Sequence, residues 1–216
     1  MGDAPYHHGD LKAEMLRKGL QLLNEEGYDG FSLRKLAALC NVSHAAPYRH
    51  FKSKDDLVQA IWREMADSIR EVFYIAVRDG NTPRAQLTSL CKAYVRLMTA
   101  NPDYFRYIFM TEHGQPIVFT SDDAAYGGED HPFTIAKRFA RAYLEGVRGA
   151  ANWASDYLTL WSQLHGFILL TINHTIQFEG EPEKMAGRMV CGFFDLLEAA
   201  GMKAQSAPSK ENLPLL

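Results

Sequence analysis

Apolar residues recur at intervals of three and four along most of this chain, and short polar breaks separate the runs. Such spacing is typical of helices that bury one face, whereas the alternation at every second residue that marks half-buried strands does not occur. The hydrophobic pattern therefore predicts an all-α protein.

Residues that cap or end helices stand at the polar breaks. Asp10 is a candidate N-cap, Gly27 fits a left-handed helix end, and Ser53 with Asp56 resembles a capping box. Scattered Gly, Pro, Asp and Ser predict a long loop over residues 113–131. We expect helices over residues 11–26, 33–39, 43–51, 54–78, 83–100, 102–112, 132–149, 152–178 and 182–200.

Residues 31–54, FSLRKLAALCNVSHAAPYRHFKSK, predict two short helices around a tight turn. Ser32 can cap the first helix, and Asn41 tolerates the left-handed backbone that such a turn needs. Ser43 can cap a second helix that ends near Phe51. Two helices joined in this way form the helix-turn-helix, a unit with which proteins read DNA.

Basic residues gather in this window, although the whole chain carries a formal net charge of -3. The window contains no acidic residue, and a local excess of cations is the footprint of a surface that faces phosphate. Charge by itself also fits the solvated face of a helical hairpin, so both interpretations stay open on that ground. The positive side chains are Arg34, Lys35, Arg49, Lys52 and Lys54, with His44 and His50 able to add partial charge.

The order of residues around the turn resembles the DNA-binding half of the TetR family of bacterial transcription regulators, over residues 6 to about 65. The family pattern ends the turn with Val-Ser and continues as Tyr-x-His-Phe-x-Ser-Lys-x-x-Leu. The matching residues here are Val42, Ser43, Tyr48, His50, Phe51, Ser53, Lys54 and Leu57. Downstream, Trp161, His165 and Gly166 are similar to the Trp-x-x-x-His-Gly motif of one subgroup's C-terminal domain.

The resemblance implies an N-terminal three-helix helix-turn-helix DNA-binding domain and a larger C-terminal helical domain that binds an effector and dimerises. We place the arm and helix-turn-helix in residues 1–53, a connecting helix in 54–78, the second domain in 79–203 and a tail in 204–216. The expected function is sequence-specific transcriptional regulation, with a repressor released from its operator by a small organic ligand. No cofactor is expected.

The matched register also implies roles for individual residues. Tyr48, His50 and Lys54 match positions that resemble phosphate contacts, which orient a domain without reading sequence. Base reading then falls to Arg34, whose guanidinium suits guanine, and to residues at the start of the second helix, such as Ala45, whose methyl suits thymine. The expected DNA-contacting set is Arg34, Lys35, Ser43, His44, Ala45, Ala46, Tyr48, Arg49, His50 and Lys54.

Pro47 departs from the family pattern, in which many members have an apolar residue with a free N–H. Proline is tolerated only in the first turn of a helix. The second helix is therefore expected to start close to Ser43 or His44.

Aromatic residues concentrate on three consecutive predicted helices of the second domain. Rings between helices line apolar ligand pockets, but they also fill ordinary cores, and the sequence leaves both interpretations open. Trp161 and His165 are four residues apart and share a helix face. With the resemblance, the expected ligand-binding set is Tyr94, Phe105, Phe109, Tyr157, Trp161 and His165.

The last two predicted helices are apolar on more than one side, and a helix of that kind needs two partners. One partner is the domain's own core, and the other is either a second subunit or more of the same core. We expect a homodimer that binds a pseudo-palindromic double-stranded operator. Its interface helices would begin at Asn152 and Pro182 and end at Phe178 and Ala200.

The sequence lacks the motifs that mark other classes of protein. No Gly-x-Ser-x-Gly elbow, phosphate-binding glycine loop or His-Glu-x-x-His helix occurs, so we do not expect an enzyme. A metal- or thiol-responsive regulator using His113, His131 and Cys91 is an alternative, although these residues lack ligand spacing. Cys40, Cys91 and Cys191 are far apart, which predicts small core residues in a reducing compartment. No apolar run is long enough to cross a bilayer, which favours a cytoplasmic protein without a membrane partner.

Overall fold

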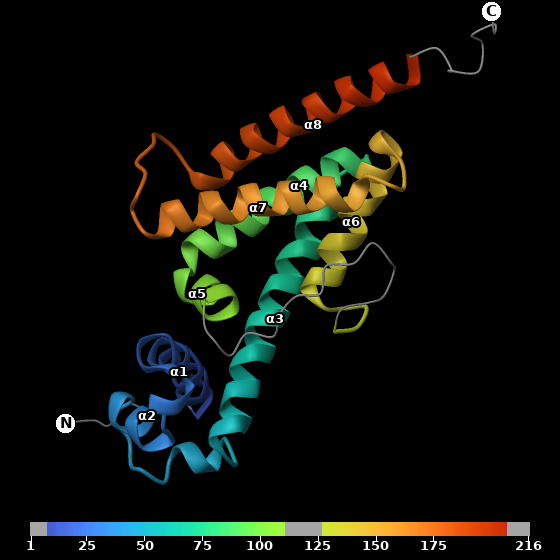
Figure 1. Cartoon of the computed structure of the whole chain (residues 1–216). Helices are drawn as coiled ribbons and strands as arrows, with labels where there is room; N and C mark the ends of the chain where they lie inside the picture. Colours follow the sequence, from blue (N-terminus) through green and yellow to red (C-terminus); the bar gives the residue numbers. More distant parts are fainter. Residues whose placement is uncertain (1–7, 111–126, 207–216) are drawn as a thin grey trace, which may run out of the picture. The chain divides into compact units, whose positions relative to one another are not determined.

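The computed structural model describes residues 8–110 and 127–206, and these residues form eight α-helices, one short 3-10 turn and no strand (Figure 1). The all-α prediction is therefore confirmed. The chain separates into two compact units. Unit 1 consists of Met1–Glu71 with Ala100–Val118, and unit 2 consists of Val72–Thr99 with Phe119–Leu216.

Unit 1 is built from α1 (His8–Gly30), α2 (Leu33–Leu39), the 3-10 turn η1 (Pro47–Arg49), the first part of α3 (Lys54–Arg78) and α5 (Pro102–Met110). α1 packs against both α2 and α5. Buried apolar side chains from the four helices and the segments between them form one core, which includes Met15, Leu23, Phe31, Leu36, Phe51, Leu57, Ile61 and Tyr107.

The caps predicted at Ser32 and Ser53 are present. Ser32 Oγ accepts a hydrogen bond of 3.2 Å from the backbone N–H of Lys35 and so begins α2. Ser53 Oγ accepts 3.1 Å from the N–H of Asp56, whose carboxylate accepts 2.9 Å from the N–H of Lys52. This reciprocal pair is a capping box displaced by one residue, and it fixes the start of α3.

The second helix of the predicted helix-turn-helix is not a regular helix. Asn41 takes the left-handed backbone as expected, with φ of 55°. Beyond it, the N–H of Ala46 donates to the carbonyl of Ser43 at 2.9 Å, and His50 donates to Pro47 at 3.0 Å. Both are i to i+3 bonds. Because Pro47 has no N–H, an α-helix beginning at Ser43 would lose its first bond, and the segment closes as successive tight turns around η1 instead.

Both ends of α1 differ from the predicted ends at Leu11 and Glu26. The helix already begins at His8, so Asp10 lies inside it rather than at its N-cap. At the other end, Gly27 has φ of 70° and ψ of 178°, the positive φ that the sequence predicted. That break turns the chain, and a further single turn leads to Gly30.

Unit 2 contains α4 (Pro83–Ala100), α6 (Pro132–Arg148), α7 (Trp153–Ile172) and α8 (Pro182–Ser206), joined by the last turns of α3. α6 packs against both α7 and α8, and α7 packs against α8 (Figure 1). The buried faces meet in a core that includes Leu87, Val95, Met98, Ile135, Leu144, Trp153, Leu160, Ile168, Val190 and Phe194.

α7 ends at Ile172, six residues before the predicted end at Phe178. His174 takes φ of 54°, its N–H donates to Thr171, and the N–H of Thr175 donates to Leu170. This pair of bonds is a Schellman cap with histidine in the place that glycine usually holds. A local cap therefore ends the helix even though apolar residues follow it.

α8, by contrast, runs past the predicted end at Ala200. Gly201 lies so close to α6 that a Cβ would stand 2.6 Å from the carbonyl oxygen of Val147. The glycine thus serves a close approach of two helices rather than a helix end, and α8 continues to Ser206. Most of the loop expected over residues 113–131 lies outside the described residues.

Candidate nucleic-acid interface and ligand site

Residues 43–51, which we call the turn segment, present their polar side chains to solvent because their apolar side chains point inward. Pro47 and Phe51 are buried in the core of unit 1. Tyr48 between them is 61% exposed, which is unusual for so large a ring. The other exposed members of the expected set are Arg34, Lys35, Ser43, His44, Ala45 and Arg49, while His50 and Lys54 are partly exposed.

Two residues of the expected DNA-contacting set are committed elsewhere. Ala46 is only 8% exposed and belongs to the core of unit 1, so its methyl does not face outward. The ammonium of Lys35 pairs with Glu26 and donates to the carbonyl of Gly30 at 2.9 Å. Lys35 therefore ties α2 to the end of α1.

Lys54, at the start of α3, is held in a different way. Its Nζ lies 3.9 Å from the centroid of the Tyr28 ring, a cation–π contact. The Tyr28 hydroxyl in turn donates to Asp55 Oδ1, and this hydrogen bond is the main reason why the pKa of Tyr28 is raised. The ammonium remains partly exposed beside the turn segment. Cations, imidazoles and an exposed phenol are thus brought together on one part of unit 1.

The candidate ligand residues of unit 2 form a cluster of rings, which we call the aromatic cluster: Phe73, Tyr94, Phe133, Tyr157, Trp161 and His165. The Tyr94 hydroxyl lies 2.7 Å from His165 Nε2, and the two rings stack with centroids 5.7 Å apart. Trp161 meets His165 edge-on at 4.5 Å. Phe133 lies 5.6 Å from Trp161 and 6.2 Å from Tyr157.

Burial keeps the ionisable groups of this cluster, and the neighbouring Cys91, uncharged. It lowers the pKa of His165 to about 4, so the imidazole is neutral at pH 7. It raises the pKa of Cys91 to about 12 and raises the pKa of Tyr94 and Tyr157 well above the usual range. The arrangement suits an apolar, uncharged ligand that exchanges a hydrogen bond with an imidazole or a phenol.

Two members of the expected ligand set belong to the other unit. Phe105 and Phe109 lie on α5, where their rings pack together with centroids 5.1 Å apart, and α5 packs on α1 in unit 1. The structure therefore gathers Tyr94, Tyr157, Trp161 and His165 in unit 2 and places the two phenylalanines with the helix-turn-helix unit.

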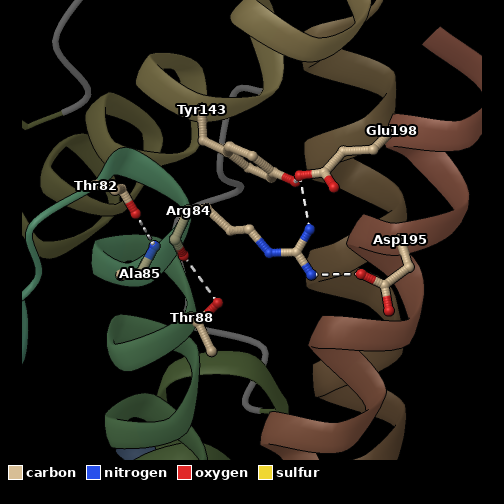
Figure 2. A network of polar contacts seen from close by, with 7 residues as sticks. All are labelled: Thr82, Arg84, Ala85, Thr88, Tyr143, Asp195 and Glu198. Atoms are coloured by element: carbon tan, nitrogen blue, oxygen red, sulfur yellow. Dashed lines mark hydrogen bonds and ion pairs between the residues drawn. The ribbon is translucent and has the colours of Figure 1, made fainter. Parts of the chain in front are cut away.

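A second polar network joins three helices of unit 2 (Figure 2). Arg84, in the first turn of α4, reaches Asp195 at 2.5 Å and Glu198 at 2.6 Å on α8. Tyr143 of α6 donates to Glu198 at 2.7 Å. The Tyr143 hydroxyl, then Arg84, hold the pKa of Glu198 below its usual range. Thr82 Oγ1 caps α4 by accepting from the N–H of Ala85 (Figure 2).

Several residues of these sites were not predicted from the sequence. Tyr28 and Arg84 act across helices far apart in the chain, and no local pattern announces such contacts. Phe73 and Phe133 did have a signal, because each is an aromatic on the apolar face of a predicted helix. Cys40 and Cys91 are buried as predicted, but the prediction was wrong for Cys191, which is exposed on α8.

Within the ranges 8–110 and 127–206, no helix has the length and apolar character to cross a membrane. The same residues hold no group of three or more His, Cys, Asp or Glu arranged to bind a metal ion.

Comparisons with known proteins all point to the same family. A family model described as bacterial regulatory proteins of the tetR family matches residues 15–61, and one described as a tetracyclin repressor-like C-terminal domain matches residues 87–193. The class A tetracycline repressor from transposon 1721 of Escherichia coli is 30% identical over 114 residues, which span 50% of this chain and 49% of that relative. An uncharacterised HTH-type transcriptional regulator of Mycobacterium tuberculosis is 27% identical over 166 residues, 74% of this chain and 70% of that protein.

Solved structures share the fold over nearly the whole chain. A Rhodococcus protein of unknown function has a TM-score of 0.61 at 23% identity, covering 91% of this chain and all of that one. A TetR-like regulator from Rhodococcus has a TM-score of 0.58 at 13% identity, with 94% and 99% covered. A TetR family regulator from Thermus thermophilus gives 0.60 at 20% identity, with 86% and 97% covered. With the helix-turn-helix region at one end and the matched helical domain after it, this chain belongs to the TetR family of transcriptional regulators.

Proposed function

We propose that this protein is a homodimeric repressor that binds a pseudo-palindromic operator in the cytoplasm and leaves it when a small organic effector binds to unit 2. The observation that carries the proposal is the exposed set of polar side chains around the turn after α2, which lies within the range that the tetR family model matches. Tyr48, His50 and Lys54 contact phosphates, while Arg34, His44 and Ala45 reach base edges. Ala46, being buried, is left out of the base-reading group.

The dimer is proposed from apolar side chains that the single chain leaves open on α7 and α8. Leu196 is 72% exposed and Met202 66%, and Leu158 and Leu170 are also exposed. The opposite face of α8, with Val190 and Phe194, is already buried in the core of unit 2. Pairing these helices about a two-fold axis would cover the open face and present the helix-turn-helix of each protomer to one of two successive major grooves.

The aromatic cluster is the proposed effector site. It contains a neutral imidazole and phenol joined by a hydrogen bond, and it includes Phe73 from the last turns of α3. The ring of Phe73 meets that of Tyr94 at 6.2 Å. Because α3 begins in unit 1 with Lys54, a ligand that displaces Tyr94 or Phe73 acts on the helix shared by both units.

Such a ligand shifts the protein only through its different affinity for the two states. Turning a mostly DNA-competent dimer into a mostly incompetent one takes a preference of about 10⁴-fold. Effectors are therefore found by release of DNA rather than by binding alone. The test is a compound screen on a protein–DNA complex with tryptophan fluorescence recorded in parallel. A true effector changes the fluorescence and releases DNA at the same concentration, and His165→Leu raises that concentration while sparing ligand-free DNA affinity. A compound that acts with equal potency on this variant would place the effector site elsewhere.

A metal- or thiol-responsive regulator has less support. Cys91 is buried with a raised pKa, which disfavours the thiolate that both chemistries need. His131 uses its Nδ1 to accept from the N–H of Phe133 and so caps α6, while His113 lies outside the described residues. Addition of zinc or peroxide is expected to leave DNA affinity unchanged.

A further inference from the structure

Tyr28, in the last turn of α1, contacts two consecutive residues at the start of α3 with the two ends of its side chain. The break at Gly27 redirects the chain within α1, and Tyr28 is the first residue beyond it. The face of its ring lies under the ammonium of Lys54, 3.9 Å from Nζ to centroid. Its hydroxyl donates to the carboxylate of Asp55.

Each contact has a consequence for a lysine that must meet a phosphate. A lysine side chain is long and flexible, and an ammonium over a ring face loses part of that freedom while keeping its charge and its N–H donors. Asp55, the next residue, offers a negative group that competes with phosphate for the same ammonium. A hydrogen bond from the Tyr28 phenol engages one oxygen of that carboxylate and so weakens the competition.

We propose that Tyr28 is a positioning residue for DNA binding, whose ring seats the Lys54 ammonium and whose hydroxyl engages Asp55, so that Lys54 is free to meet a phosphate. The inference rests on the proposed function, because it takes Lys54 as a phosphate contact. Tyr28 itself touches no DNA in this account. The capping box of Ser53 and Asp56 fixes the backbone at the same place, so Tyr28 acts on the side chains.

The first experiment is a double-mutant cycle with the full-length protein and a duplex selected by the wild type from a randomised library. The variants are Tyr28→Leu, Lys54→Met and the pair, and the readouts are the dissociation constant and its dependence on salt. Tyr28→Leu should weaken binding by about 4- to 25-fold, since each of two sites in the dimer loses a factor of about two to five. In the Lys54→Met background, Tyr28→Leu should raise the dissociation constant by less than about twofold, as expected for coupled residues.

The second experiment uses a variant that keeps the aromatic ring, and it therefore controls for a folding defect in Tyr28→Leu. Tyr28→Phe frees the Asp55 carboxylate, and Asp55→Asn then removes it. Asp55→Asn should raise DNA affinity by a larger factor in the Tyr28→Phe background than in the wild type. A purely structural role for Tyr28 would give equal factors.

The outcomes distinguish a failure of the Lys54 phosphate contact from a failure of the positioning role of Tyr28. If Lys54→Met leaves both DNA affinity and its salt dependence unchanged, Lys54 does not contact a phosphate, and the positioning role of Tyr28 is overturned as well. If Lys54→Met weakens binding but Tyr28→Leu costs the same in both backgrounds, and Asp55→Asn acts equally in both of its own, the role of Tyr28 alone is overturned.

Discussion

Lys35 and Lys54 show at the scale of single residues that surroundings, rather than residue type, assign a role. Both lie in the same basic window and both were expected to contact DNA. Lys35 is held by Glu26 and the carbonyl of Gly30, whereas Lys54 rests on an aromatic ring and keeps its charge available. A sequence gives no sign of which basic side chains are already paired.

This difference predicts opposite phenotypes for two matched variants. Lys35→Met should lower the free energy of unfolding by no more than about 1 kcal/mol, as for other exposed ion pairs, and leave the salt dependence of DNA binding unchanged. Lys54→Met should flatten that dependence by about one unit of slope for each phosphate that the side chain no longer neutralises. Denaturant melts and salt titrations of both variants measure this. Equal salt slopes for the two variants would argue against the assignment.

Arg34 is the residue proposed to read a base. Arg34→Ala should cost about 1 to 3 kcal/mol of binding free energy and relax the preference at one base pair in each half-site. Selection of duplexes from a random library by the variant measures both effects. An unchanged preferred sequence would remove Arg34 from the reading group.

His165 predicts how stability depends on pH. Its pKa is lowered from 6.5 to about 4 by burial, so the unfolded chain binds a proton more readily than the folded one. The stabilisation is therefore complete above pH 6.5 and is lost as the pH falls toward 4, with a slope of at most about 1.4 kcal/mol per pH unit. Urea melts from pH 7 to pH 4 should show a shallower decline for His165→Gln. A parallel decline in both proteins would mean that another group titrates.

At the scale of helices, the network around Arg84 holds three elements of unit 2 together through side chains on α4, α6 and α8 (Figure 2). Arg84→Met should lower the free energy of unfolding by about 1 to 2 kcal/mol, because two ion pairs of good geometry are removed together. Arg96→Met, on an exposed face of the same helix, serves as the control and should change it by less than about 0.5 kcal/mol. Equal effects in thermal melts would show that the network contributes nothing.

Most helices were predictable because a periodic apolar face and a local cap suffice to define them. Ser32, Asn41 and Ser53 act within their own turn, and each performs the predicted role. The errors arose where a competing feature decided the outcome. Pro47 removed a hydrogen bond from the second helix of the helix-turn-helix, and His174 adopted a left-handed backbone usually left to glycine. The sequence shows Pro47 but not how the segment closes without that hydrogen bond, and it gives no sign that a histidine adopts a left-handed backbone.

The candidate sites were predictable to different degrees at the scale of the whole molecule. The basic window is contiguous, so its surface followed from one stretch of chain. The aromatic set was drawn from several helices, and sequence order suggested that α5 would join them. α5 instead packs on α1, which is decided by long-range contacts between distant segments.

The proposed dimer makes a prediction of its own. Leu196→Glu places a charge on the open face of α8 and should convert dimer to monomer at micromolar concentration, with a large loss of DNA affinity. Sedimentation and gel-shift titration measure the two effects. Ile75→Glu, an equally drastic change at an exposed position of α3, should leave the protein dimeric. A dimer that survives Leu196→Glu would place the interface elsewhere.

Two copies of the chain are proposed to read a two-fold symmetric DNA site through their helix-turn-helix units. The most direct measurement is footprinting combined with stoichiometry on a duplex selected by the wild-type protein. We expect two protomers on one pseudo-palindrome, half-sites about 34 to 36 Å apart, and an affinity at least about 10³-fold above that for a scrambled duplex. One protomer bound to an isolated half-site with undiminished affinity, or no preference over the scrambled duplex, would contradict it.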